Sequence, residues 1–96
     1  MITLDSAFPL VSIPNYQFHL LQSTTKGTES VRMLMDFLFE EEAFAEKNCT
    51  YIRTKFEDKY NVILRYASRK HSMKATEVNK CITNKCTQTK LKKAFN

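Results

Sequence analysis

The chain has 96 residues and a formal net charge of +5, with 43% apolar and 26% charged residues, as is typical of one globular domain. It contains one glycine and two prolines, too few for the frequent turns of β-sandwiches and β-barrels. We expect no membrane span and no signal peptide, because no long uncharged apolar stretch and no basic N-terminal leader is present. The composition predicts an all-α fold, a compact bundle of about five helices with a short extended N-terminal segment.

The start of the chain is predicted to be extended and then briefly helical. Residues 2–13 alternate loosely between apolar and polar residues, and prolines interrupt them, as in extended chain. Pro14 suits the first turn of a short helix that runs to about Leu21, with Phe18 and Leu21 on its buried side. Residues 23–28 (STTKGT), which include the glycine, form the clearest connector.

Two helices are predicted between residues 29 and 45. The first begins at Glu29 and Ser30, because apolar residues then recur at the spacing of a core-facing stripe. This stripe consists of Val31, Leu34, Met35 and Leu38. Three glutamates at 40–42 favour the first turn of a second, short helix with Phe44 and Ala45 on its apolar side. Consecutive residues do not face one point, so these glutamates are not expected to bind a metal.

Two longer helices are predicted after a break. Residues 48–53 read as a loop or a short extended piece, and Thr54 with Glu57 matches a capping box that starts the next helix. The apolar side of that helix consists of Phe56, Tyr60, Ile63, Leu64 and Ala67. Basic residues at 68–72 (SRKHS) mark its end, and a last helix begins near Lys74 or Ala75. The buried side of the last helix consists of Val78, Cys81, Ile82 and Cys86.

Charge is unevenly spread along the chain. Residues 1–64 hold six basic and nine acidic residues, a net charge of −3, whereas residues 65–96 hold nine basic residues and only Glu77, a net charge of +8. Such asymmetry favours a polyanion as the partner of the C-terminal third. The alternative interpretation is a basic tail that is merely solvated.

The outward side of the last helix combines hydroxyls, amides and lysines, and no acid follows Glu77. Amides and hydroxyls can read base edges, whereas lysines meet phosphates or guanine. The base-edge candidates are Lys80, Thr83, Asn84, Thr87 and Gln88. The phosphate candidates are Arg69, Lys70, His71, Lys74, Lys85 and Lys90, with Ser23, Thr24 and Lys26 of the connector as weaker ones. For each of these residues taken singly, the alternative interpretation is an ordinary surface residue without a binding role.

The three cysteines cannot all pair within the chain, and Cys81 and Cys86 do not have the spacing of a zinc site. We expect free thiols, no metal and no cofactor. The chain has no G-x-S-x-G, HExxH or P-loop motif, so we do not expect an enzyme. A nucleophilic pair of Cys49 with His19 or His71 stays open, although no spacing supports it.

Two separated blocks resemble the BEN domain family. Residues 29–48 (ESVRMLMDFLFEEEAFAEKN) resemble its helix with an apolar-Leu-Phe step and the acid-rich segment that follows. Residues 77–86 (EVNKCITNKC) resemble its closing pattern of Val, then Ile, then Lys-Cys. The resemblance covers residues 28–90 of a single domain spanning 1–96, in which residues 1–22 are the extended segment and short helix.

The chain departs from the family pattern at two places. After Asn48 it runs NCTYIRTKFED, whereas many members have a longer polar loop with a glycine. Residues 87–90 (TQTK) follow the Lys-Cys step, where many members have acidic or arginine residues. The preferred DNA sequence is therefore expected to differ from that of better known members. The family pattern points to Thr87 and Gln88 as base readers, whereas helix geometry ranks Asn84 first, and both remain open here.

BEN domains are small, mainly α-helical modules of animal chromatin and transcription proteins and of some DNA viruses. Several bind double-stranded DNA sequence-specifically, often as homodimers on palindromic sites, and others contact chromatin or corepressor proteins. The resemblance implies a nuclear DNA-binding module, commonly in a transcriptional repressor, or a viral one located where viral DNA replicates. The alternative is a protein-interaction module whose basic side meets an acidic partner.

Overall fold

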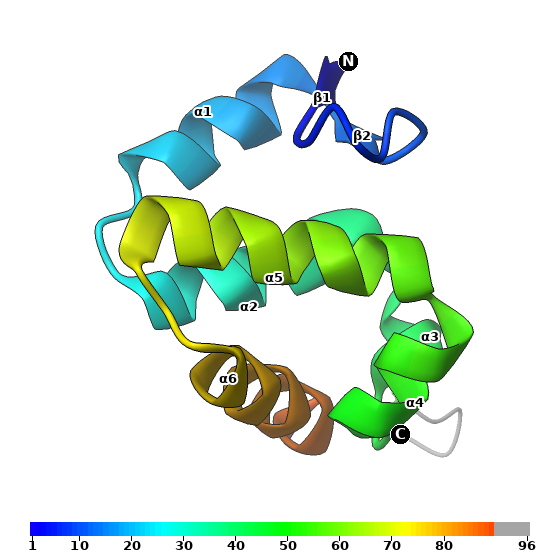
Figure 1. Cartoon of the computed structure of the whole chain (residues 1–96). Coiled ribbons are helices and arrows are strands. Elements are labelled where there is room, and N and C mark those ends of the chain that lie inside the picture. The colour runs from blue at the N-terminus through cyan, green and yellow to red at the C-terminus, as the bar shows by residue number, and fades with distance from the viewer. Residues whose placement is uncertain (90–96) are drawn as a thin grey trace, which may run out of the picture.

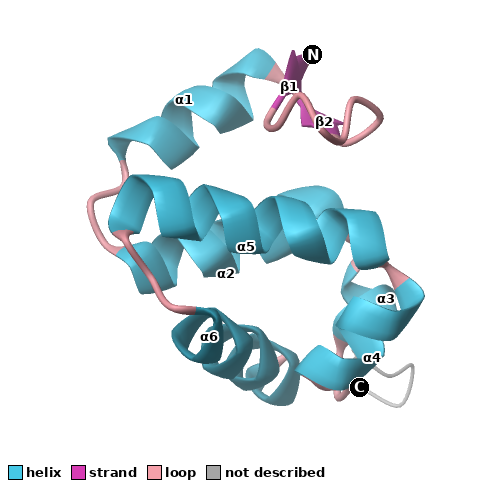
Figure 2. Cartoon of the chain, viewed as in Figure 1, coloured by secondary structure: helices cyan, strands magenta, loops and turns pink. Residues whose placement is uncertain are grey.

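The structure is a computed structural model that describes residues 1–89 (Figure 1). Over these residues the chain forms six helices and one two-stranded antiparallel sheet. The strands are β1 (Ile2–Thr3) and β2 (Ser12–Ile13), and they pair Ile2 with Ile13. The helices are α1 (Asn15–Ser23), α2 (Gly27–Leu38), α3 (Glu41–Phe44), α4 (Cys49–Lys55), α5 (Glu57–His71) and α6 (Ala75–Gln88). The predicted all-α bundle with an extended N-terminal segment is confirmed, and Figure 2 shows the strands confined to that segment.

Helix α2 forms the centre of the bundle because α1, α5 and α6 all pack against it. The predicted stripe of α2 is buried, with Val31, Leu34 and Met35 fully excluded from solvent. Helix α5 crosses α2, and α6 lies below both in Figure 1. Ile63 of α5 and Ile82 of α6 are also fully buried, so the three helices share one core.

The short elements partly follow the prediction. Pro14 is the N-cap of α1, Leu21 is fully buried, and Phe18 is half-buried against the core. Helix α3 begins in the run of glutamates, and both Phe44 and Ala45 are buried, as predicted. Helix α2 begins at Gly27 rather than at Glu29, so the connector is shorter than predicted.

The segment 48–53 is where the prediction was wrong, because it forms most of α4 rather than a loop or extended piece. The Asn48 side chain caps this helix by accepting a hydrogen bond from the Tyr51 backbone N–H at 2.9 Å. On the inner side of α4, Cys49 is buried and Ile52 is fully buried. A polar cap and two inward residues are enough to stabilise a short helix that packs against its neighbours.

The predicted capping box at Thr54 is also wrong. Thr54 lies inside α4, and α5 begins at Glu57 with Phe56 as the residue between them. The Phe56 N–H donates to the Ile52 carbonyl at 2.8 Å, and the Phe56 carbonyl accepts from the Tyr60 N–H at 2.9 Å. One residue thus ends α4 and starts α5, and no room remains for a side-chain cap.

On the predicted apolar side of α5, Tyr60, Ile63 and Ala67 are buried, whereas Phe56 and Leu64 are half-buried.

The single glycine lies where α2 meets the turn between α5 and α6. A Cβ at Gly27 would come within 2.5 Å of Met73 Sδ and 3.1 Å of His71 Cβ. Glycine therefore permits the close approach of this turn to the start of α2.

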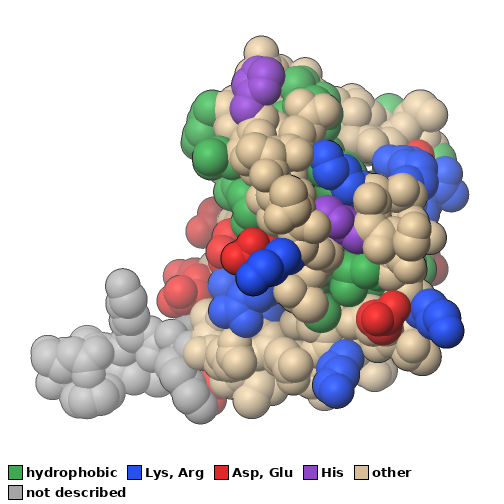
Figure 3. Space-filling view, turned by 90° about the vertical axis from the view of Figure 1, so that its left-hand side faces the viewer, with side chains coloured by type: hydrophobic (Ala, Val, Ile, Leu, Met, Phe, Trp, Pro, Cys, Tyr) green, Lys and Arg blue, Asp and Glu red, His purple; other side chains and the backbone are tan. Residues whose placement is uncertain are grey.

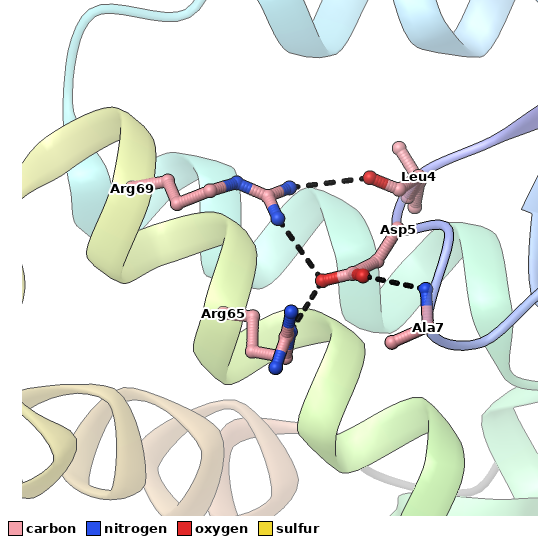
Figure 4. A network of polar contacts seen from close by, with 5 residues as sticks. All are labelled: Leu4, Asp5, Ala7, Arg65 and Arg69. Atoms are coloured by element: carbon pink, nitrogen blue, oxygen red, sulfur yellow. Dashed lines mark hydrogen bonds and ion pairs between the residues drawn. The ribbon is translucent and has the colours of Figure 1, made fainter.

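The N-terminal segment is held on α5 by one carboxylate (Figure 4). Arg65 Nε and Arg69 Nη1 donate to Asp5 Oδ2 at 2.5 Å and 3.0 Å, and the Ala7 N–H donates to Asp5 Oδ1 at 2.9 Å. Arg69 Nη2 also donates to the Leu4 carbonyl at 3.2 Å. The Asp5 side chain is only 3% exposed, so this carboxylate is buried with its charge compensated.

Candidate nucleic-acid interface

Helix α6 is positioned by a local cap and by an inward apolar side. The Glu77 carboxylate accepts a hydrogen bond from the Lys74 backbone N–H at 2.8 Å, which stabilises the first turn. Val78, Ile82 and Cys86 are fully buried, as predicted. Cys81 is half-buried rather than buried, because it lies at the edge of the contact with the core.

Three of the base-edge candidates are exposed on the outward side of α6. Lys80, Asn84 and Thr87 follow one another at intervals of four and three residues, so they share one side of the helix. The one acid of α6, exposed Glu77, lies three residues before Lys80 and so on the same side, where its carboxylate accepts the hydrogen bond from Lys74. Beyond Glu77, this side presents only neutral polar groups and positive charge. Such a surface can accept a polyanion and form hydrogen bonds to its bases.

Thr83 does not lie on that outward surface, contrary to the prediction. Its side chain is half-buried, and its Oγ1 accepts a hydrogen bond from the Cys49 backbone N–H at 3.0 Å. This N–H belongs to the first turn of α4 and has no partner within that helix. Thr83 thus connects α6 to α4.

Gln88 is exposed, but its carbonyl oxygen is already engaged. Arg32 of α2 donates from Nη1 to Gln88 Oε1 at 2.7 Å. Arg32 was not among the predicted site residues, although the structure places its guanidinium at the end of α6. No spacing rule could have found it, because the two residues are brought together only by the packing of α2 on α6.

Two of the predicted phosphate ligands form ion pairs with carboxylates inside the molecule. Arg69 shares Asp5 with Arg65. Lys85 is mostly buried, with a side-chain exposure of 15%, and its Nζ lies 2.9 Å from Asp36 Oδ1. Lys85 is therefore turned toward α2 and away from the outward surface of α6.

Lys70 and His71 also have partners within the fold. Lys70 Nζ donates to the Gln22 carbonyl at 2.9 Å, but it is exposed and keeps its charge. His71 Nε2 lies 2.7 Å from the hydroxyl of buried Ser30. Partial burial, followed by the charge of Lys70, lowers the pKa of His71, so the ring is mainly neutral at neutral pH. His71 thus adds no positive charge to this surface.

The candidates in the connector also divide into residues that are hydrogen-bonded within the fold and residues that are exposed. The hydroxyls of Ser23 and Thr24 both donate to the Leu20 carbonyl, at 2.8 Å and 3.0 Å. Lys26 is exposed at the N-cap of α2, and Lys74 is exposed at the N-cap of α6. Lys90 lies outside the described residues.

The end of the molecule that carries the α1–α2 connector and the α5–α6 turn is shown in Figure 3. Basic side chains occupy several separate points on this face, with acidic side chains among them. On this face, the positive charge of the described residues is thus divided by the fold into local groups. We call the exposed residues Lys26, Lys70, Lys74, Lys80, Asn84 and Thr87 the α6 surface set.

Among residues 1–89, no hydrogen bond joins Cys49 to His19 or His71, the pairs that the sequence left open. Cys49 Sγ donates to Asn79 Oδ1 at 3.4 Å, and burial raises the pKa of the Cys49 thiol, whereas His71 bonds to Ser30. Within residues 1–89, no three His, Cys, Asp or Glu side chains are grouped so that they could hold a metal ion. None of the helices over the same residues is long and apolar enough to cross a membrane.

Comparison with models of known protein families, with curated proteins and with solved structures finds no match for this chain.

Proposed function

We propose that this chain is a BEN-like module that binds double-stranded DNA in a sequence-specific way through α6 and the turn before it. The observation that carries the proposal is the outward side of α6, where Lys80, Asn84 and Thr87 are exposed together and the one acid of the helix, Glu77, is engaged by the Lys74 backbone N–H. An α-helix of this kind fits the major groove of B-DNA, where base edges carry a distinct pattern of donors and acceptors.

The phosphate contacts in this proposal come from the exposed lysines. Lys74 and Lys80 lie at the start and on the outward side of α6, and Lys26 and Lys70 lie on the neighbouring elements. Lys80 was predicted at a base edge, but its ammonium is a point charge that suits phosphate, and the proposal assigns it there. None of these four ammonium groups is paired with a carboxylate among the described residues, so each can replace a counterion on the DNA backbone. Arg69 and Lys85 are left out because each already forms an ion pair within the fold, Arg69 with Asp5 and Lys85 with Asp36.

Asn84 is the base reader in this proposal. Its amide is exposed, and a carboxamide can form a bidentate pair with adenine in the major groove. Gln88 offers the same chemistry, but Arg32 already occupies its carbonyl oxygen. The pair of Arg32 and Gln88 then acts as one unit at the end of α6, with the guanidinium directed toward phosphate or guanine.

The wider role rests on the BEN resemblance together with this surface. We infer a nuclear module that regulates transcription, most simply as part of a repressor, or a viral module at sites of DNA replication. A homodimer on a palindromic site and contacts with chromatin or corepressor proteins belong to the same proposal.

Selection from random DNA duplexes, followed by gel shift on the enriched site, tests the proposal. One enriched motif is expected, and Asn84→Ala should weaken binding to that motif by about 1–3 kcal/mol while nonspecific binding barely changes. Lys80→Ala should weaken binding to all sequences alike. Lys55→Ala is the matched control, because Lys55 is an exposed lysine at the end of α4, outside the α6 surface set.

If selection enriches no motif, and Lys80→Ala and Lys55→Ala have equal effects, the proposal is wrong. Tight binding to an acidic protein in that case would support the protein-interaction module instead.

A further inference from the structure

A second surface lies in the angle between α5 and the beginning of α6. It is a hollow of about 370 Å³, a size within the range of small-ligand and side-chain pockets. Its lining residues are Leu64, Arg65, Ser68, Arg69, Met73 and Ala75. The lining is mainly apolar, and the polar groups stand on its α5 side.

The two arginines leave this hollow with an uncompensated positive charge. Their side chains are 52% and 53% exposed, and both donate to the same carboxylate, Asp5. One negative charge cannot neutralise two guanidiniums, so the Arg65–Arg69 pair retains one positive charge beside an apolar floor. A guanidinium held in place by an existing ion pair loses little freedom when it binds a further carboxylate.

The hollow lies on a different side of α6 from the proposed DNA surface. Ala75, at the hollow, and Lys80, on the outward side, are separated by about 140° around the helix at about 100° per residue. A ligand in the hollow therefore leaves the outward side of α6 accessible.

The chain itself does not provide a suitable occupant. Residues 39–44 combine acids with aromatics, but Phe39 and Phe44 are buried in the core. Residues 56–60 also combine them, but Tyr60 is buried and Phe56 is half-buried against the core. A second copy therefore cannot offer those rings. The sequence of residues 90–96 contains three lysines and no acid, so its charge has the wrong sign for the arginine pair.

We propose that this hollow binds a short acidic segment of a partner protein, with one apolar side chain against Leu64 and Met73 and a carboxylate on the Arg65–Arg69 pair. Apolar anchors set between charge-assisted hydrogen bonds are typical of tight peptide recognition. This inference does not depend on DNA binding, because it uses different residues and a different side of α6.

The test is a phage selection of random peptides on the full chain, followed by fluorescence polarisation with the most enriched peptide. Peptides that combine Asp or Glu with a large apolar residue should be enriched. Ser68 is exposed in the lining, so Ser68→Glu should weaken binding by about tenfold or more, because like charges across an interface repel. Ser68→Lys changes the same position without adding a negative charge and should retain binding.

Thr50→Glu is the charge-matched control, because Thr50 is exposed in the first turn of α4, away from the hollow. It should leave peptide affinity unchanged. Enrichment of peptides without acids, or equal affinity of Ser68→Glu and the unmodified chain, would overturn the inference. Loss of duplex DNA binding in Ser68→Glu without any peptide enrichment would assign the hollow to nucleic acid and overturn it as well.

Discussion

At the scale of the single residue, Asp5 connects the N-terminal segment to α5 and has a pKa that reports this connection. Hydrogen bonds from Arg65, then from the Ala7 N–H and from Arg69, lower the pKa of Asp5 from 3.8 to about 2. Because the pKa of Asp5 is lower in the folded state than in the unfolded state, the ionised carboxylate stabilises the fold. This stabilisation is fully present at a pH above the ordinary pKa of 3.8, and it is lost as the pH falls through the folded-state pKa of about 2.

The expected outcome is that Asp5→Asn is less stable than the unmodified chain at neutral pH and that the difference narrows as the pH falls below 3.8. Urea unfolding followed by circular dichroism across the acid range measures both free energies of unfolding. If the free energies of unfolding of the two proteins change in parallel across the acid range, Asp5 does not contribute in this way.

Thr83 illustrates how a residue predicted to read DNA is used inside the fold. Thr83→Val keeps the shape of the side chain but removes the acceptor for the Cys49 N–H, so we expect a loss of about 1 kcal/mol in unfolding free energy. Thr83→Ser should retain most of the stability because it keeps the hydroxyl. If Thr83→Val changes the selected DNA motif and leaves stability unaltered, Thr83 acts as a base reader after all.

At the scale of the element, α4 depends on its cap. Asn48→Ala removes the acceptor for the Tyr51 N–H and should lower the unfolding free energy by about 1 kcal/mol. Asn48→Asp keeps an acceptor at the N-terminus of the helix and is the matched control. Chemical denaturation compares the three proteins, and equal stability of all three would mean that α4 is held by packing alone.

The register of α6 can be measured through its thiols. Burial raises the pKa of Cys86 to about 11, from 9.0, which lowers its thiolate population by about a hundredfold. Cys49 is also buried, whereas Cys81 is half-buried at the edge of the core. We expect maleimide to label Cys81 first and Cys86 and Cys49 much later, as followed by mass spectrometry.

All three cysteines should label at similar rates in denaturant. Equal rates in the folded protein would contradict the register of α6 and the orientation of its outward side.

At the scale of the whole molecule, the fold reduces the charge available to a polyanion. Four exposed lysines of the α6 surface set lack a carboxylate partner among the described residues, so the slope of log K against log salt should be about −3 to −4, at roughly −0.9 per phosphate contact. Lys74→Ala should flatten the slope by about 1, whereas Lys55→Ala should not change it. Titration of a labelled duplex at several salt concentrations gives the slope, and one shallower than about −2 contradicts the proposed contacts.

Helices with a sustained apolar period were predictable from the sequence. The stripe of α2 and the inward residues Val78, Ile82 and Cys86 of α6 are buried as predicted, because helical periodicity is determined by residues only three and four positions apart. The all-α class followed from the scarcity of glycine and proline. The short helix α4 was missed, because one cap and two inward residues form too weak a local pattern to distinguish it from a loop.

Only the tertiary structure decided which polar residues remain available for a partner. The exposed lysines could be predicted, but the pairing of Asp5 with Arg65 and Arg69 joins residues 60 and 64 positions apart, and that of Arg32 with Gln88 joins residues 56 apart. Such pairs depend on how helices pack, and no periodic pattern in the sequence specifies them. The sequence by itself determined that α6 is amphipathic and basic, whereas the packing of α2, α4 and α5 around it determined which part of that charge faces outward.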